Sequence, residues 1–361
     1  MKGSGVKSRF YGFGPKRQDG FSLVELMVAI TLGLFILAGM TTVFVNNSRT
    51  RGEIERSNRQ IENGRYAMQV LGDDLRLSGY LAEFDLGAAL TTGLALPATK
   101  PNPCITTVAA INGSLPLHIQ GYDVGDTPPA CLTDVKAGTD IVVIRRASSC
   151  KSGDLNCADV AGAPYFQASL CNGPNELGSP SPLNFYNLDT NTAGLTRTLR
   201  NCATLAPIRR YIERIYYVAN NDVAGDGIPT LKRAELGAGG AFTVVPIAQG
   251  IENMQLEYGI DPNGVNQGVP SVFTASPDLL GACAPAQCVM NWRDTVSVKV
   301  YLLARNTEPT FGGYSDTKTY VLGLNAAGNP NTVTPAAGDQ YKRHVYQAEL
   351  RLVNPAGRRE Q

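Results

Sequence analysis

The stretch Gly20-Phe21-Ser22-Leu23-Val24-Glu25-Leu26 opens an apolar run that continues to Val45. Glu25 is the only charged residue among the 25 residues from Phe21 to Val45. A carboxylate at the centre of a bilayer costs about 2.5 to 3.5 kcal/mol on insertion scales, so a plain lipid anchor should lack one. The sequence therefore predicts a membrane helix in which Glu25 needs a specific partner.

The run is long enough to span a membrane, because about 20 helical residues cross a hydrocarbon core of about 30 Å. The residues before it carry one acidic group, Asp19, and five basic ones: Lys2, Lys7, Arg9, Lys16 and Arg17. By the positive-inside rule this basic segment stays in the cytoplasm. We therefore expect a single-pass protein whose residues after Val45 lie on the outer side.

An ordinary secretory signal carries small residues in an A-x-A-like pattern after its apolar core. Asn46-Asn47-Ser48-Arg49 follow Val45 instead, so that site is missing. Gly20 is the small residue that would admit a peptidase, and cleavage after it would keep the apolar core. The new amino group on Phe21 would then lie about one helical turn from Glu25. Pairing with that amine, in the same chain or in a neighbouring copy, would offset the cost of burying the carboxylate.

The segment from Gly20 to Glu25 resembles the prepilin cleavage and methylation signal of type IV pilins and type II secretion pseudopilins. The resemblance implies cleavage after Gly20 by a prepilin peptidase, N-methylation of Phe21 and a role for Glu25 in subunit assembly. The leader departs from the family pattern at Asp19 and in the aromatic segment Phe10-Tyr11-Gly12-Phe13. A plain signal anchor with an incidental Glu25 is the alternative.

Charge and composition exclude a general polyanion binder. Loss of residues 1–20 changes the formal net charge from +1 to +1 − 4 = −3, because five basic residues and one acidic residue leave. The remaining Lys and Arg are dispersed, whereas nucleic-acid binding needs them clustered. A hydrophobic content of 43% and a charged content of 17% suit a globular domain of about 280 residues after the helix.

The helical pattern continues beyond the apolar run. Five apolar residues are predicted to share one face of the helix: Ile54, Ile61, Met68, Leu71 and Leu75. The helix should end near Ser78-Gly79, because Gly is common just past helix ends. We expect residues 21–80 to form this helix, with a transmembrane half at 21–45 and an outer half that packs its stripe on a sheet.

Period-two alternation predicts the sheet. Polar residues alternate with apolar ones in three segments, 254–260, 296–302 and 346–352, and further strands are expected at 140–145 and 211–218. This alternation gives the sheet one buried apolar face and one solvent-exposed polar face, which indicates a largely antiparallel sheet. We expect an α+β fold of the type IV pilin kind, with a leader at 1–20, a cysteine-rich loop insertion at 81–205 and a C-terminal β-sheet domain at 206–361.

All eight cysteines come after the membrane segment, and an even number in an exported domain predicts disulfides. The sequential pairing is Cys104 with Cys131, Cys150 with Cys157, Cys171 with Cys202, and Cys283 with Cys288, although eight cysteines allow about 105 connectivities. A zinc site is the rival interpretation. Its expected CxxC spacing is missing, and only His118 and His344 could assist.

No nucleophile motif, metal motif or phosphate loop of an enzyme is found in the sequence, so we expect no catalytic activity, cofactor or small-molecule substrate. Asn220, Asp222 and Asp226 carry oxygen ligands that suit calcium, but the EF-hand pattern is incomplete. An Asn/Asp/Gly turn is the favoured interpretation, and calcium binding stays open.

The C-terminal half is similar to the PilW family of minor pilins. The similarity is carried by these segments: Tyr216-Tyr217-Val218-Ala219-Asn220, Gly227-Ile228-Pro229, Gly250 to Asp261, Trp292, Val296 to Arg305, and Arg343 to Leu352. It implies a Gram-negative inner-membrane protein with a periplasmic domain that ends at the pilus tip. It also implies partners among minor pilins, the major pilin and a tip adhesin, in a complex that primes assembly, twitching motility and adhesion.

Three rivals remain open: a type II secretion pseudopilin of the J kind, an adhesive or DNA-uptake minor pilin, and a membrane-anchored periplasmic enzyme.

Overall fold

The computed structural model describes residues 20–84, 86, 94–155, 157, 159–310 and 312–360. By internal contacts the chain forms two units, Met1–Ile54 and Glu55–Gln361. The predicted leader, with Asp19 and all five basic residues, lies outside the described residues except for Gly20.

Helix α1 spans Leu23–Leu77, close to the predicted bounds. It stops where predicted, because Gly79 adopts a left-handed φ of +71° that favours glycine just past a helix end. The backbone N–H of Gly79 donates to the carbonyl of Arg145 at 2.9 Å. This hydrogen bond joins the end of α1 to the sheet that the next elements form.

The buried stripe of α1 differs from the predicted one. Leu71 and Leu75 are fully buried as expected, and Met68 is half-buried, but Ile54 and Ile61 are exposed. The buried positions farther up the helix are Gln60, Gly64 and Ala67. A strict seven-residue spacing drifts around a helix of 3.6 residues per turn, so the prediction extrapolated onto the wrong face.

Gly64 is where α1 approaches the sheet most closely. A Cβ at Gly64 would lie 2.2 Å from the ring of Tyr346, whereas a Cβ at Gly72 would meet Leu350 at an ordinary 3.5 Å. The small side of the helix therefore fits against an aromatic ring of the facing strand. Only glycine fits at position 64 without moving that ring.

The larger sheet is antiparallel and has seven strands. They are β1 (Ile119–Tyr122), β2 (Ile141–Ala147), β3 (Tyr165–Ala168), β4 (Tyr186–Asp189), β5 (Ile208–Ala219), β6 (Thr230–Leu236) and β7 (Phe242–Gln249). The order is β1-β2-β5-β3-β4, and β6 pairs with both β5 and β7. The predicted strands at 140–145 and 211–218 are thus β2 and β5.

The expected insertion at 81–205 shares a sheet with the strands of the C-terminal domain. Its strands β1 to β4 join β5 in one sheet, because β5 is 12 residues long and pairs with β2 along one part and with β3 along another. The predicted boundary between residues 205 and 206 therefore runs through a single sheet. Loops between short strands hid this pairing from the sequence pattern.

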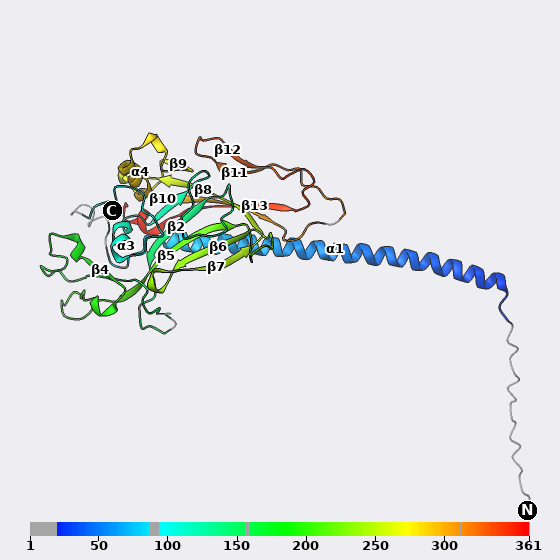
Figure 1. The fold of residues 1–361 in the computed structure, drawn as a ribbon, viewed down its shortest axis with the longest axis horizontal. Helices are drawn as coiled ribbons and strands as arrows, with labels where there is room; N and C mark the ends of the chain where they lie inside the picture. Colours follow the sequence, from blue (N-terminus) through cyan, green and yellow to red (C-terminus); the bar gives the residue numbers. More distant parts are fainter. Residues whose placement is uncertain are drawn as a thin grey trace, which may run out of the picture. The chain divides into compact units, whose positions relative to one another are not determined.

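The smaller sheet has the order β13-β10-β8-β9 and is also antiparallel. Its strands are β8 (Ile251–Ile260), β9 (Val272–Thr274), β10 (Thr295–Arg305) and β13 (Arg343–Arg351). Figure 1 shows β8, β10 and β13 as neighbours in the domain, with β2, β5, β6 and β7 adjoining them. This sheet contains the three segments that alternate with period two.

The face of β8 that was expected to be solvent-exposed is covered. A two-stranded sheet of β11 (Tyr320–Leu324) and β12 (Pro330–Val333) lies over it. The carboxylate of Glu257 accepts from the backbone N–H of Leu324 at 2.8 Å, and Asn331 donates to the side chain of Gln255 at 2.8 Å. Gln255 and Glu257 are therefore buried polar residues with partners, although their alternation predicted contact with solvent.

Short helices complete the described fold: α3 (Val108–Ser114), α4 (Pro285–Arg293) and α5 (Val353–Gly357). Five single 3-10 turns lie at Pro182–Asn184, Thr192–Gly194, Ala238–Gly240, Pro262–Gly264 and Leu280–Ala282. The main hydrophobic core combines Leu71 and Leu75 of α1 with apolar side chains from both sheets and Trp292 of α4. The α+β fold with a long helix packed on antiparallel sheets is confirmed.

A buried ionic cluster fixes α1 on the larger sheet. Asp74 is 4% exposed, and its carboxylate accepts from Arg214 at 2.7 Å, from Arg146 at 3.0 Å and from the hydroxyl of Tyr216. Burial alone would raise the pKa of Asp74, but Arg214 and the other donors outweigh it and lower that pKa below its usual range. Removal of either arginine would leave part of this buried charge uncompensated and so would destabilise the fold.

Asp140 joins the two sheets. Its backbone N–H donates to the carbonyl of Met254 at 2.9 Å, and its Oδ2 accepts from the N–H of Leu256 at 2.7 Å. Burial, together with the facing carboxylate of Asp123, raises the pKa of Asp140 well above its usual range. Asp126 adds to this repulsion and raises the pKa of Asp140 further.

We predict that Gly64→Ala lowers the free energy of unfolding by about 1 to 3 kcal/mol, because the new methyl group must displace the ring of Tyr346. Gly72→Ala is the matched control on the same helix, with room for the methyl group. That control should be neutral or stabilising by up to about 1 kcal/mol, the helix propensity of Ala over Gly. Denaturant unfolding of the full chain in detergent micelles measures both, and equal effects would contradict the close fit.

We also predict that stability falls as pH rises from about 4, the usual pKa of an unfolded Asp, toward the raised pKa of Asp140. In that window the folded chain keeps a proton that the unfolded chain releases, so deprotonation favours unfolding. One such group gives a slope of up to about 1.4 kcal/mol per pH unit. Unfolding of Asp140→Asn followed between pH 4 and 8 should show a flatter profile, and an unchanged slope would contradict the prediction.

Candidate processing and assembly site

The start of α1 is built as a capping box. Ser22 precedes the first helical residue, Leu23, and Glu25 stands three residues after Ser22. The backbone N–H of Ser22 donates to Oε2 of Glu25 at 2.9 Å, and the N–H of Glu25 donates to Oγ of Ser22 at 3.3 Å. Two helix-end donors are therefore satisfied by side chains of the same turn.

This geometry gives Glu25 a partner that the sequence pattern had not led us to predict. The signal was present, because Ser-x-x-Glu before an apolar run is the known pattern of a capping box. The carboxylate of Glu25 already lies beside the backbone of Ser22, the residue next to Phe21. An amino group on Phe21 would thus be one residue from a nitrogen that Glu25 contacts.

The apolar segment exposes hydrophobic side chains on every face. Exposed fractions include 89% for Phe21, 74% for Phe35 and 73% for Phe44. Its threonines are satisfied within the helix, because the hydroxyls of Thr31 and Thr41 each donate to the carbonyl four residues earlier at 2.7 Å. Among the described helices, α1 alone is long and apolar enough to cross a membrane. Glu25 is the charged exception in this segment.

The cysteines form four disulfides in the structure: Cys104–Cys131, Cys150–Cys157, Cys171–Cys202 and Cys283–Cys288. These are the pairs of the sequential arrangement. Three of them lie between α1 and β5, where long loops connect short strands. A covalent link there limits the conformations of an unfolded loop and so stabilises the fold.

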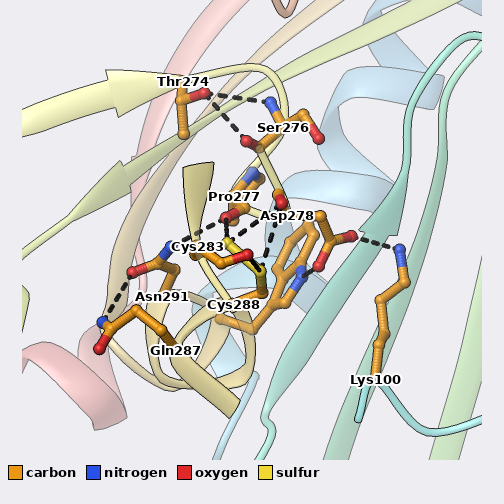
Figure 2. Close-up of a disulfide and its surroundings, with 10 residues drawn as sticks. Lys100, Thr274, Ser276, Pro277, Asp278, Cys283, Gln287, Cys288 and Asn291 are labelled. Atoms are coloured by element: carbon orange, nitrogen blue, oxygen red, sulfur yellow. Dashed lines mark hydrogen bonds and ion pairs between the residues drawn. A yellow bond between two sulfur atoms is a disulfide. The ribbon is translucent and has the colours of Figure 1, made fainter. Parts of the chain in front are cut away.

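The fourth disulfide closes the turn before α4, as Figure 2 shows. Asp278 lies beside it and accepts from Nε1 of Trp292 at 2.7 Å, while Lys100 donates to the other oxygen of the same carboxylate. Lys100 also lies 4.5 Å from the ring centroid of Tyr122. The disulfide, the ion pair and the indole together anchor α4 to the end of β1.

The other candidate ligands have structural partners. His118 is buried, and its Nε2 lies 2.8 Å from the carbonyl of Thr295; burial lowers the pKa of His118 to about 3. His344 packs edge-on against Tyr346. In the part of the chain that the structure describes, no group of three or more His, Cys, Asp or Glu is arranged to hold a metal ion.

The Asn220 to Asp226 segment forms a turn. The carboxylate of Asp226 accepts from the backbone N–H groups of Asp222, Val223 and Ile228 at 2.9 to 3.1 Å. These backbone donors lower the pKa of Asp226 below its usual range. Asp222 in turn accepts from Gln249 at 2.8 Å. The carboxylates therefore stabilise the connection between β5 and β6.

Comparison with known families gives one match near the N-terminus and one in the C-terminal half of the chain. Residues 15–41 match the family described as Prokaryotic N-terminal methylation motif. Residues 215–354 match the family described as Type IV Pilus-assembly protein W. Together the two matches support a type IV pilus minor pilin of the PilW kind. No curated protein and no solved structure matches it.

The PilW match extends from β5 to the start of α5 and so contains the whole smaller sheet. Gly250 is the corner between β7 of the larger sheet and β8 of the smaller one. Its φ is +77°, and a Cβ there would lie 2.5 Å from the carbonyl oxygen of Arg305. Both facts require glycine at this position. PilW proteins are structural components of the pilus, and the methylation motif together with the long apolar helix α1 supports a membrane-anchored pilin.

We predict that Ser22→Ala loosens the first turn of α1, because it removes the oxygen that accepts from the N–H of Glu25. Loss of a Ser cap costs about 1 kcal/mol, which corresponds to a roughly five-fold faster hydrogen exchange of that amide. Exchange measured on the full chain in micelles tests this. Ser22→Thr keeps the hydroxyl and should exchange like the natural chain; equal rates in all three proteins would contradict the cap.

Proposed function

We propose that this minor pilin belongs to the complex at the pilus tip that primes polymerisation of the major pilin. The observation that supports it most is the division of α1 into an apolar half with every face exposed and an outer half that packs one face against the domain. The exposed half is free to pack laterally with other pilin helices. The domain of more than 300 residues, Glu55–Gln361, is bulky for a repeating shaft, in which each copy is surrounded by neighbours.

Processing at Gly20 would give the start of α1 a new N-terminal amine that can take part in subunit assembly. Hydrolysis of the bond between Gly20 and Phe21 frees the amine of Phe21, which the family's peptidase would then methylate. That amine, as a cation, can pair with Glu25 of the same chain or of a neighbour. Because a pair at membrane depth is strongly preferred to a lone carboxylate, it would fix the axial register between subunits.

The proposed location follows from the same residues. The basic leader would remain in the cytoplasm, α1 would cross the inner membrane, and the disulfide-bonded domain would lie in the periplasm, where disulfides form. After extraction from the membrane the chain would stand at the tip with other minor pilins and a tip adhesin. The J-kind pseudopilin of type II secretion is the competing role, and the PilW match favours the pilus.

We predict that Glu25→Ala in cells lowers the recovery of other minor pilins with the tagged full chain by at least ten-fold and reduces pilus number. The reason is loss of the carboxylate that fixes register. Glu62→Ala is the matched control, because Glu62 is an exposed carboxylate of the same helix outside the apolar segment. With Glu62→Ala, the recovery of other minor pilins and the pilus number should stay unchanged.

Normal recovery and normal pilus number with Glu25→Ala would refute the register mechanism.

Deletion of the gene distinguishes a pilus subunit from a type II secretion pseudopilin. Loss of twitching with intact protein secretion supports the pilus, whereas the reverse supports the pseudopilin. Mass spectrometry of the purified chain should show an N-terminal methylated Phe21, and an uncut leader would contradict the processing step.

A further inference from the structure

A groove runs between α1 and the outer strand of the smaller sheet, within the unit Glu55–Gln361. It is lined by Ile61 and Arg65 of α1, by Lys318 of the loop before β11, and by Lys342, His344 and Tyr346 at the start of β13. The other lining residues are Ser57, Gln60, Tyr314 and Arg343, whose side chain is buried. We call these residues the β13 groove. None of the processing or capping residues belongs to it.

The β13 groove is basic, and no described carboxylate lines it. The acidic residues behind it are already paired: Glu252, Asp316 and Asp339 all contact the guanidinium of Arg343 at 2.5 to 3.1 Å. Glu308 is paired with Arg56 and Arg59. These surrounding acids are therefore occupied by Arg343, Arg56 and Arg59, and none of them pairs with Arg65 or Lys318 of the groove.

Two cations of the groove stand without an ion-pair partner among the described residues, Arg65 and Lys318, and both are exposed. Arg65 stands on α1 one turn after Ile61, and Lys318 stands on the opposite loop. Like charges that line one groove repel each other, and a carboxylate placed between them removes that repulsion.

The walls also carry apolar and aromatic surface. Ile61 is 37% exposed, although the stripe prediction had expected it to be buried. His344 and Tyr346 stack edge-on with ring centroids 4.7 Å apart, and the amine of Lys342 lies 5.6 Å from the ring centroid of Tyr314. Rings beside cations suit a peptide that brings both a carboxylate and an apolar side chain.

We propose that the β13 groove binds an acidic segment of a neighbouring pilin, with carboxylates that reach Arg65 and Lys318. The argument for this occupant is charge complementarity, and it rests on the proposed function, in which other pilins pack beside α1. β13 pairs only with β10 among the described strands, so its outer edge also leaves backbone groups available to an extended partner. The groove would orient the periplasmic domains, and Glu25 would act separately at membrane depth.

Charge reversal of the full chain in cells tests the proposal. The double variant Arg65→Glu with Lys318→Glu should lower recovery of other pilins at least ten-fold, and Arg65→Gln with Lys318→Gln should lower it several-fold. Lys151→Glu is the control, because Lys151 is an exposed lysine of the loop between β2 and β3, outside the groove. It should recover pilins at the natural level. Unchanged recovery with the double Glu variant would overturn the proposal.

Glu25→Ala measured in parallel separates this proposal from the proposed function. If Glu25→Ala loses partners while both groove variants keep them, the groove assignment is wrong and the assembly role stands. If Glu25→Ala and both groove variants all keep their partners, both proposals are wrong.

A photo-crosslinking benzoyl-phenylalanine at position 318, in an otherwise natural chain, covers the case in which the double variants do not accumulate. A covalent adduct with another pilin supports the assignment. An adduct with phospholipid alone, with nucleic acid, or with nothing overturns it.

Discussion

The ion pairs of Asp74 fix the outer half of α1 in place. A carboxylate that is 4% exposed on a helix can persist only where cations are fixed beside it, and Arg146 and Arg214 supply them from β2 and β5. Apolar packing at Leu71 is not directional, whereas a buried charge must keep its hydrogen-bond donors within reach. Asp74 therefore sets the rotation and height of α1 on the larger sheet, and with it the positions of Gly64 and the β13 groove.

The same helix carries a second carboxylate with opposite requirements. Glu25 lies in a segment whose apolar side chains are all exposed, and its described partner is the backbone N–H of Ser22 in its own first turn. That bond satisfies only part of a charged group. The charge of Asp74 is neutralised by arginines of its own chain, whereas the carboxylate of Glu25 retains the capacity to bind a cation. This difference explains how one helix can hold a domain firmly and still serve as an assembly element.

The two sheets are held together by polar as well as apolar contacts. Asp140 bonds to the backbone of β8, and Gly250 makes the turn from β7 into β8. Both devices depend on residues whose partners are distant in sequence. The raised pKa of Asp140 makes the stability of this junction fall as pH rises, whereas the lowered pKa of Asp74 favours folding as pH rises from acid values.

The sequence by itself determined the local elements of this protein: the apolar helix with Glu25, the helix end at Gly79, and strands whose side chains alternate, such as Val298 and Val300. These result from short-range periodicity and chain geometry. Pairing in space belongs to the tertiary structure, because β5 selects β2 and β3 across loops, and the hairpin of β11 and β12 covers Glu257. The face of α1 that is buried was also decided there, since the charge of Asp74 and the small size of Gly64 outweigh the apolar spacing that began at Ile54. The capping box of Ser22 and Glu25 was readable in the sequence, and only its geometry showed that it places the carboxylate beside Phe21.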